Sequence, residues 1–166
     1  MRPSVESVRP ETADAGLDAG LGEVLGPLHE SWVEETRCYL DPASCSSAPF
    51  WDRWSVVRYL NDQFPARFAL EYELIRELRP FMERHHAETL EAGAERLVRL
   101  RLGLDRLGRR RGTSAEFAPM VEEFLLALEL WCAEIELAVR TVQRRDLPAE
   151  GSRLLARLEA GLPAVE

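Results

Sequence analysis

The chain has 166 residues, which is the size of one domain and enough to bury a hydrophobic core without disulfides or a structural metal. With 46% hydrophobic and 30% charged residues, its composition is that of a folded protein and excludes a disordered chain. The formal net charge of −8 excludes a protein whose whole surface binds nucleic acid or anionic lipid.

All 21 basic residues are arginine, which excludes chemistry that needs a lysine, such as a Schiff base. The three cysteines form no Cys-x-x-Cys pair, and their odd number favours free thiols in a reducing compartment. The N-terminus lacks the apolar segment of a signal peptide, and the most apolar stretch, residues 124–139, contains glutamates that disfavour a membrane span. We therefore expect a cytoplasmic protein with no membrane partner.

The first part of the chain is not expected to fold. Residues 1–20 are rich in glycine, proline and acidic residues, which predicts a flexible acidic arm ahead of one helical domain over residues 21–166. Glycines up to Gly26 also disfavour a helix. We therefore expect the first firm helix to begin near Pro27, because proline suits the first turn of a helix, and to end before Asp41.

A serine-rich loop over residues 42–48 precedes a second helix that begins at Pro49. Pro65 then breaks or bends the chain before a third helix, because proline has no backbone N–H to donate. The inward face of the second helix is predicted to carry Phe50, Trp54 and Val57. This assignment leaves Trp51 without a place in the core, which makes it a candidate contact for a partner.

Pro80 lies within an otherwise helical pattern, where a proline costs about 3 kcal/mol through a lost hydrogen bond and a steric clash. Either the helix kinks there or a new helix begins, and we adopt one long helix kinked near Pro80. It ends at Gly108, where a run of arginines suits the negative end of the helix dipole. Its apolar face comprises Leu90, Gly93, Leu97, Leu100, Leu104 and Leu107.

The next helix follows a capping-box sequence, Thr113–Glu116, and carries the most regular apolar pattern of the chain. The spacing of four and three residues is typical of a helix packed along its length against near-parallel partners, with its glutamates as solvated flanks. The seam comprises Phe117, Val121, Phe124, Leu128, Trp131, Ile135, Ala138 and Val142. A short helix near residues 149–162 follows, and no segment alternates as a β-strand does. The sequence therefore predicts an all-α fold, an antiparallel bundle of four main helices with one or two short ones.

Glu83 and His86 form a Glu-x-x-His motif at the start of the Leu90 pattern. His86 falls about 40° from Leu90 around the helix, so we expect both side chains to face the bundle interior or its boundary. An inward Glu-x-x-His is half of the ligand set of a ferritin-like di-metal centre, which makes iron, manganese or zinc a candidate cofactor. The second half is absent, because the other histidines are His85, on the flank, and His29, in the first helix.

Several alternatives to a di-metal centre stay open. His86 could form a hydrogen-bonded polar end to the apolar stripe, and a homodimer could complete a metal site by pairing two Glu-x-x-His motifs. A zinc site is a further alternative, although the spacing of its ligands matches no familiar zinc motif. Its ligands would be His29, Cys38, Cys45 and Cys132.

Arginines dominate residues 96–111, with Asp105 as the only local acid. Three of them share the side of the helix opposite the leucines, which makes them candidate contacts for phosphate, nucleic acid or an acidic partner. These three are Arg99, Arg106 and Arg110. No aromatic residue lies among them, which disfavours binding of a single strand by base stacking.

Apolar residues surround more of the helix that begins at Phe117 than a monomeric bundle needs. Leu126, Leu130 and Leu137 lie outside its seam and, with Trp51, are candidate interface residues. We therefore expect a non-enzymatic helical-bundle protein that acts through protein–protein association as a homodimer. The alternatives are a metal-binding or oxidoreductase protein that uses the Glu-x-x-His motif, and phosphate or nucleic-acid binding by the arginine face.

Overall fold

The computed structural model describes residues 19–40, 53–110 and 115–161. Within these ranges every regular element is a helix, and extended pairing is limited to an isolated bridge between Gly20 and Gln143. The predicted all-α fold is confirmed. The α-helices are α2 (Leu21–Leu40), α3 (Arg53–Arg58), α4 (Phe64–Leu78), α5 (Arg84–Arg109), α6 (Phe117–Ala138) and α7 (Ala149–Ala160).

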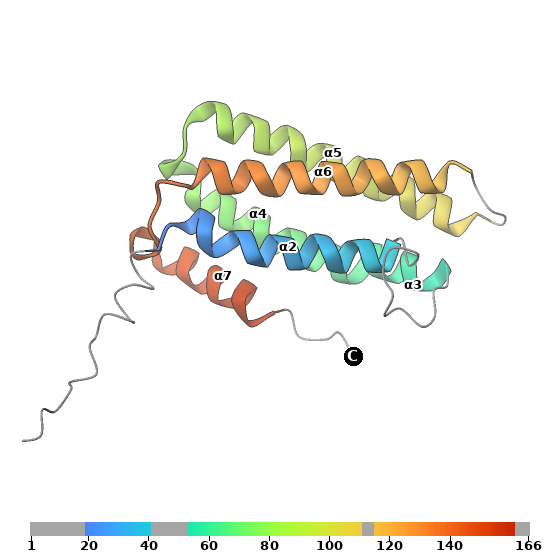
Figure 1. Ribbon diagram of the computed structural model, residues 1–166, viewed down its shortest axis with the longest axis horizontal. Helices are drawn as coiled ribbons and strands as arrows, with labels where there is room; N and C mark the ends of the chain where they lie inside the picture. The colour runs from blue at the N-terminus through green and yellow to red at the C-terminus, as the bar shows by residue number, and fades with distance from the viewer. Residues whose placement is uncertain (1–18, 41–52, 111–114, 162–166) are drawn as a thin grey trace, which may run out of the picture.

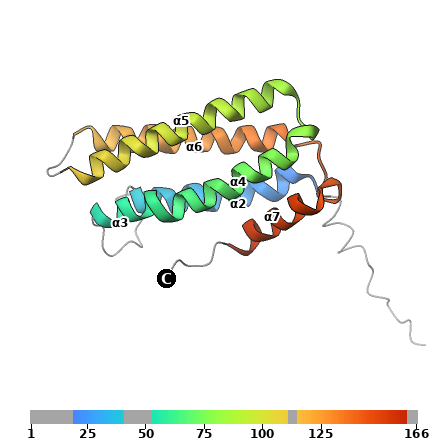
Figure 2. The same cartoon turned by 180° about the vertical axis from the view of Figure 1, so that it is seen from behind.

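The main helices alternate in direction along the chain (Figure 1). α2 runs from one end of the bundle to the other, α3 and α4 return together, α5 runs forward again and α6 returns. α6 packs against both α5 and α2, and the short α7 packs against α4 (Figure 2). This is the predicted antiparallel bundle with a short additional helix.

α2 begins earlier than predicted, at Leu21, so that Pro27 lies inside the helix. The segment after α6 holds its start in place. Leu21 donates its backbone N–H to the carbonyl of Val142 at 2.9 Å, and Arg144 donates to the carbonyl of Ala19 at 3.0 Å. These bonds satisfy backbone groups at the helix start and offset the low helix propensity of the local glycines.

The helical backbone does not break at Pro65. It continues from α3 into α4 through a π-helical turn, Tyr59–Gln63, whose wider geometry accommodates a residue that lacks a backbone N–H. Within this turn Asn61 donates its side-chain amide to the carbonyl of Val57 at 2.7 Å. A side chain thus supplies a donor to a backbone acceptor where the regular ladder is interrupted.

Trp54 does not face inward, and this prediction is wrong. α3 turns Val56 and Val57 into the core and leaves Trp54 65% exposed. A residue two positions before Val56 lies on nearly the opposite side of the helix, which accounts for the exposure. Trp51 and residues 1–18 of the predicted arm lie outside the described residues.

The chain breaks at Pro80, so the prediction of one long kinked helix is wrong. α4 ends before a 3₁₀ turn, Arg79–Phe81, and Met82 and Glu83 are extended before α5 begins at Arg84. Proline is tolerated in this short turn because its missing N–H is not needed by a regular helix. The break produces two antiparallel helices and leaves the start of α5 at one end of the bundle (Figure 2).

The core is built from aromatic rings where α2, α4 and α6 meet. Trp32 stacks on Phe64 with ring centres 5.4 Å apart, and Trp131 stacks on Phe68 at 5.1 Å. The indole N–H of Trp131 donates to the backbone carbonyl of Leu90 in α5 at 2.9 Å. The predicted seam of α6 is buried at every position after the first, so that pattern is confirmed.

The close approach of α5 and α6 depends on Gly93. A Cβ atom at Gly93 would lie 2.7 Å from Cδ1 of Trp131, a buried ring that its hydrogen bond to Leu90 holds in place. A Cβ atom at Gly103 would lie 3.0 Å from Sδ of Met120. Because the methionine side chain is flexible, it can move aside at Gly103, whereas the indole cannot at Gly93.

We predict that Gly93→Ala lowers the free energy of unfolding by about 1–3 kcal/mol, the usual cost of overpacking a core. Gly103→Ala is expected to leave it unchanged or to raise it, because alanine favours a helix over glycine by about 1 kcal/mol. Urea unfolding followed by circular dichroism measures both. Equal effects of the two substitutions would contradict the proposed role of Trp131.

Candidate functional site

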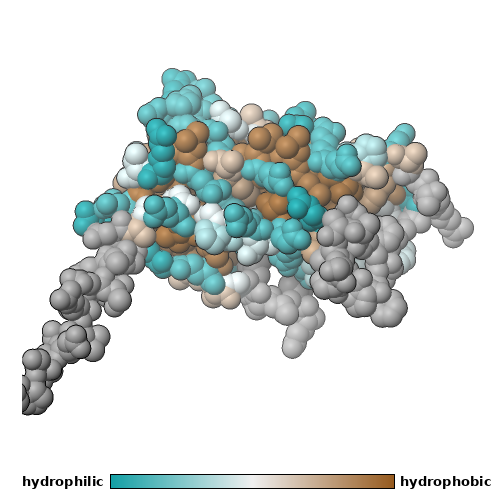
Figure 3. All heavy atoms as spheres, viewed as in Figure 1, coloured by the Kyte–Doolittle hydropathy of each residue, from teal (hydrophilic) through white to brown (hydrophobic). Residues whose placement is uncertain are grey.

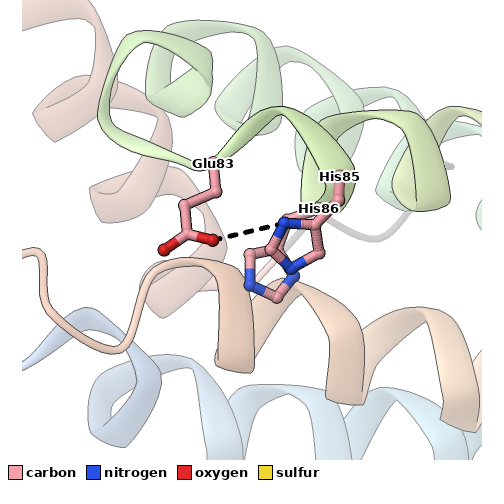
Figure 4. Close-up of side chains that lie close together, drawn as sticks. All are labelled: Glu83, His85 and His86. Atoms are coloured by element: carbon pink, nitrogen blue, oxygen red, sulfur yellow. Dashed lines mark ion pairs between the residues drawn. The ribbon is translucent and has the colours of Figure 1, made fainter.

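The Glu-x-x-His motif lies at the exposed start of α5 (Figure 4). Glu83 is the N-cap residue, and because its backbone is extended rather than helical, its side chain is exposed instead of facing inward as predicted. Nδ1 of His85 lies 3.2 Å from Oε2 of Glu83, and the rings of His85 and His86 have centres 3.9 Å apart. One ligand atom from each residue lies within 4.8 Å of the other two.

His86 lies at the boundary of the bundle, as predicted, and is largely buried. Its Nδ1 is 2.6 Å from Oε1 of Glu134 on α6. The prediction that the glutamates of α6 are solvated flanks is therefore wrong at Glu134. A carboxylate on one ring nitrogen fixes the orientation of an imidazole and leaves the other nitrogen available.

A second polar cluster, centred on His29, lies inside the bundle and was not predicted from the sequence. His29 on α2 is 2% exposed, and its ring nitrogens each lie 3.1 Å from a carboxylate, one from Glu71 on α4 and one from Glu136 on α6. Arg67 donates to the other oxygen of Glu71 through Nε and Nη2, at 3.2 and 3.1 Å. We call the row Arg67–Glu71–His29–Glu136 the buried charge chain.

The buried charge chain is charged at neutral pH. Burial alone lowers the pKa of His29, but the hydrogen bonds and charges of Glu136 and Glu71 outweigh burial and raise that pKa to about 9. Burial alone raises the pKa of Glu71, but its contacts with His29 and Arg67 outweigh burial and hold the pKa below its ordinary value. Because ionised carboxylates only accept hydrogen bonds, both nitrogens of His29 donate and the ring is an imidazolium.

A pocket of about 410 Å³ opens beside His29, between α2 and α6, and is lined in part by Cys132 and Arg37. Burial raises the pKa of the Cys132 thiol, and the charges of Glu71 and Glu136 raise it further. A protonated thiol is a poor nucleophile and a poor metal ligand. The pocket therefore does not support covalent catalysis through Cys132.

The alternative zinc site is not supported either. Cys38 is disulfide-bonded, so the expectation of free thiols is wrong at this residue, although it holds at Cys132. Both ring nitrogens of His29 are engaged by carboxylates and lack a lone pair for a metal. Cys45 lies outside the described residues.

The three leucines that the sequence singled out lie on the outer face of α6. Leu126, Leu130 and Leu137 are 52%, 55% and 44% exposed. Exposed Ala133 completes a row with a spacing of four, three and four residues, which we call the outer stripe. Figure 3 shows apolar side chains gathered over α6 on this face of the molecule.

Four glutamates of α6 border the outer stripe, two on each side, and each lies beside an arginine or histidine of a neighbouring helix. The segment that forms α6 contains five glutamates and no basic residue, so any charge compensation must come from neighbouring helices. On the α2 side the pairs are Glu129 with Arg37 and Glu136 with His29, and on the α5 side they are Glu123 with Arg96 and Glu134 with His86.

The three arginines of the predicted face are exposed, whereas neighbouring arginines of residues 96–111 are engaged within the chain. Arg109 pairs with Asp105 at 3.0 Å, and Arg101 donates to the backbone carbonyl of Leu60 at 3.1 Å. The candidate contact residues that are exposed are Arg99, Arg106 and Arg110. Phosphate or nucleic-acid binding by these residues stays a prediction.

No protein family, curated protein or solved structure matches this chain. Among the described helices, none is both long enough and apolar enough to cross a membrane.

The raised pKa of His29 predicts a loss of stability at alkaline pH. A protonated His29 stabilises the fold fully below its unfolded pKa of 6.5, and this contribution is lost as pH rises through about 9. We expect the free energy of unfolding to fall by about 3 kcal/mol between pH 6.5 and pH 10 from this group. Urea unfolding at a series of pH values measures the loss.

Two variants isolate the contribution of His29. His29→Gln cannot titrate, so its stability should lack the alkaline loss that the wild type shows. His85→Gln removes an exposed histidine and should keep that loss. An alkaline loss of the same size in His29→Gln and in the wild type would show that His29 is not its source.

Proposed function

We propose that this protein is a non-enzymatic module that acts through protein–protein association, as a homodimer in which the outer stripes of two α6 helices pack together. The row of exposed Leu126, Leu130 and Leu137 carries the proposal. Single exposed leucines are ordinary on a protein surface, but a continuous apolar row on one helix is typical of an interaction site. The opposite face of α6 is already buried in its own bundle.

The charge pattern beside the outer stripe supports self-association. Two copies of an acidic helix repel each other unless their charges are compensated, because like charges across an interface are costly. In this chain Arg37 and His29 of α2 and Arg96 of α5 supply the compensation within each copy, while His86 lies within hydrogen-bond distance of Glu134. A second copy can therefore approach without bringing uncompensated rows of carboxylates together.

The spacing of the outer stripe favours a second copy of this chain as the partner. The four positions are symmetrical about their midpoint, so an antiparallel pair related by a two-fold axis is self-complementary. Leu126 would lie opposite Leu137 of the second copy, and Leu130 opposite Ala133. The small alanine leaves space for the facing leucine, which permits the close approach that knobs-into-holes packing requires.

Charges at the two ends of α6 also match in this arrangement. Glu122, near the start of α6, and Arg140, just after its end, are both exposed. An antiparallel pair brings each of them near the oppositely charged residue of the second copy, whereas a parallel pair brings like charges together. A stable interface buries about 800 Å² per partner, which is more than three half-exposed leucines provide. Residues of α2 and α5 beside the outer stripe must therefore contribute the remaining area.

We predict that Leu130→Glu disrupts the dimer, because it places a charge at the centre of the interface. The dissociation constant should rise by at least about 30-fold, equivalent to about 2 kcal/mol. Light scattering coupled to size-exclusion chromatography measures the mass over a concentration series. The wild type should approach twice the 18.9 kDa of one chain, and the variant should remain at the mass of one chain.

Leu102→Glu is the matched control. Leu102 is 43% exposed, but it lies on α5, outside the outer stripe, so its replacement should leave the dimer intact. A wild-type protein that stays monomeric at concentrations on the order of 10 μM would refute the proposal, since a functional homodimer requires association in that range. Equal disruption of the dimer by the two substitutions would also contradict the assignment of the interface to the outer stripe.

A further inference from the structure

We propose that Glu83, His85 and His86 bind a divalent transition-metal ion at the start of α5, independently of the proposed dimer. The three side chains offer one carboxylate and two imidazoles, and their ligand atoms lie within 4.8 Å of one another. This is a single-ion site built from one continuous segment. It differs from the di-metal centre expected from an inward Glu-x-x-His, because it would hold one ion with three ligands and needs no second motif.

The carboxylate of Glu83 is free of the usual task of an N-cap side chain. Its backbone carbonyl accepts the first helical hydrogen bonds, from the N–H groups of His86 at 3.1 Å and Ala87 at 3.2 Å, while its side chain caps no backbone N–H. The carboxylate instead lies beside the ring of His85 (Figure 4). The break of the chain at Pro80 places this segment in solvent, where a metal ion can reach it.

Glu134 prepares His86 for metal binding. A histidine that binds a metal usually donates its other ring N–H to a carboxylate, which fixes the tautomer and increases the basicity of the ligating nitrogen. The contact of His86 Nδ1 with Glu134 at 2.6 Å has this form. Glu134 belongs to α6, so the support of His86 comes from the rigid bundle rather than from the segment that carries the ligands.

The charges around the site favour a cation. Glu83 and Glu134 contribute two carboxylates, and the neighbouring Arg84 is engaged by Glu88 at 2.9 Å. The positive end of the α5 dipole opposes a cation by only about 0.3–1 kcal/mol at an exposed position. Direct coordination by three donors outweighs this opposing effect, since imidazole and carboxylate groups are the ordinary ligands of such ions.

The donor set indicates which ions fit. Two imidazoles and one carboxylate suit zinc, iron(II), cobalt, nickel and copper, and disfavour calcium and magnesium, which prefer oxygen. Ligand atoms around one tetrahedral zinc lie about 3.4 Å apart, given metal–ligand bonds of about 2.1 Å. The exposed side chains of Glu83 and His85 can close this difference by small rotations, while His86 stays in place. Three protein ligands leave at least one position for water.

Equilibrium dialysis of the untagged full-length protein against zinc tests the site, after treatment with a chelator to remove metal. We expect one zinc ion per chain. His86→Ala and His85→Ala should each lower the affinity by at least about tenfold, the scale on which single ligands or their supporting partners act. Glu88→Gln, which changes an exposed carboxylate on the same helix outside the ligand set, should bind as the wild type does.

Two further measurements distinguish a built site from adventitious binding. Glu134→Gln should keep the stoichiometry but weaken the affinity by about tenfold, because it removes the carboxylate that orients His86. An excess of magnesium should not displace zinc, because two of the three ligands are imidazoles and magnesium prefers oxygen ligands. Wild-type protein that binds no zinc, or a double variant His85→Ala/His86→Ala that binds as the wild type does, would overturn the proposal.

Discussion

The buried charge chain is the interaction on which the arrangement of the bundle depends. Glu71 is fully buried, and an isolated carboxylate there would be untenable. It is tolerated because His29 and Arg67 approach it from either side, and His29 in turn requires Glu136. Removing one member of a buried ion pair typically costs about 3–5 kcal/mol, because its partner is left uncompensated. The buried charge chain therefore fixes the register of α2, α4 and α6 more specifically than apolar contacts alone would.

α6 connects this interior constraint with the surface of the molecule. Its inner face forms the apolar seam, and its flanking glutamates are engaged by basic residues of α2 and α5. Glu136 belongs to the buried charge chain, and Glu134 orients His86 beside the proposed metal site. The leucines between these glutamates form an apolar surface on a helix whose own sequence is strongly acidic.

The sequence predicted the features that depend on regular spacing, and missed those that depend on contacts between distant residues. The seam of α6 and its exposed leucines follow from helical periodicity and are confirmed in position. His29 and Glu71 each occupy a leucine-like position in an apolar stripe, so a pair of opposite charge could have been suspected, but spacing alone does not show which helices face each other. The start of α2 was missed because hydrogen bonds from residues after α6 stabilise it. Pro80 ends a helix rather than kinking it, and this exposed Glu83.

Because the chain has no lysine, an introduced lysine can show by cross-linking whether two α6 helices pair in antiparallel orientation, as we propose. Arg140→Lys introduces an amine at an exposed position while keeping the charge. A carbodiimide joins an amine to a carboxylate only when the two are in contact. From Glu122 to the end of α6 the helix spans about 24 Å, so a link between the introduced lysine and Glu122 must join two copies. Mass spectrometry of the cross-linked dimer should identify this link. If the introduced lysine were linked only to carboxylates of its own chain, the proposed antiparallel pairing would be wrong.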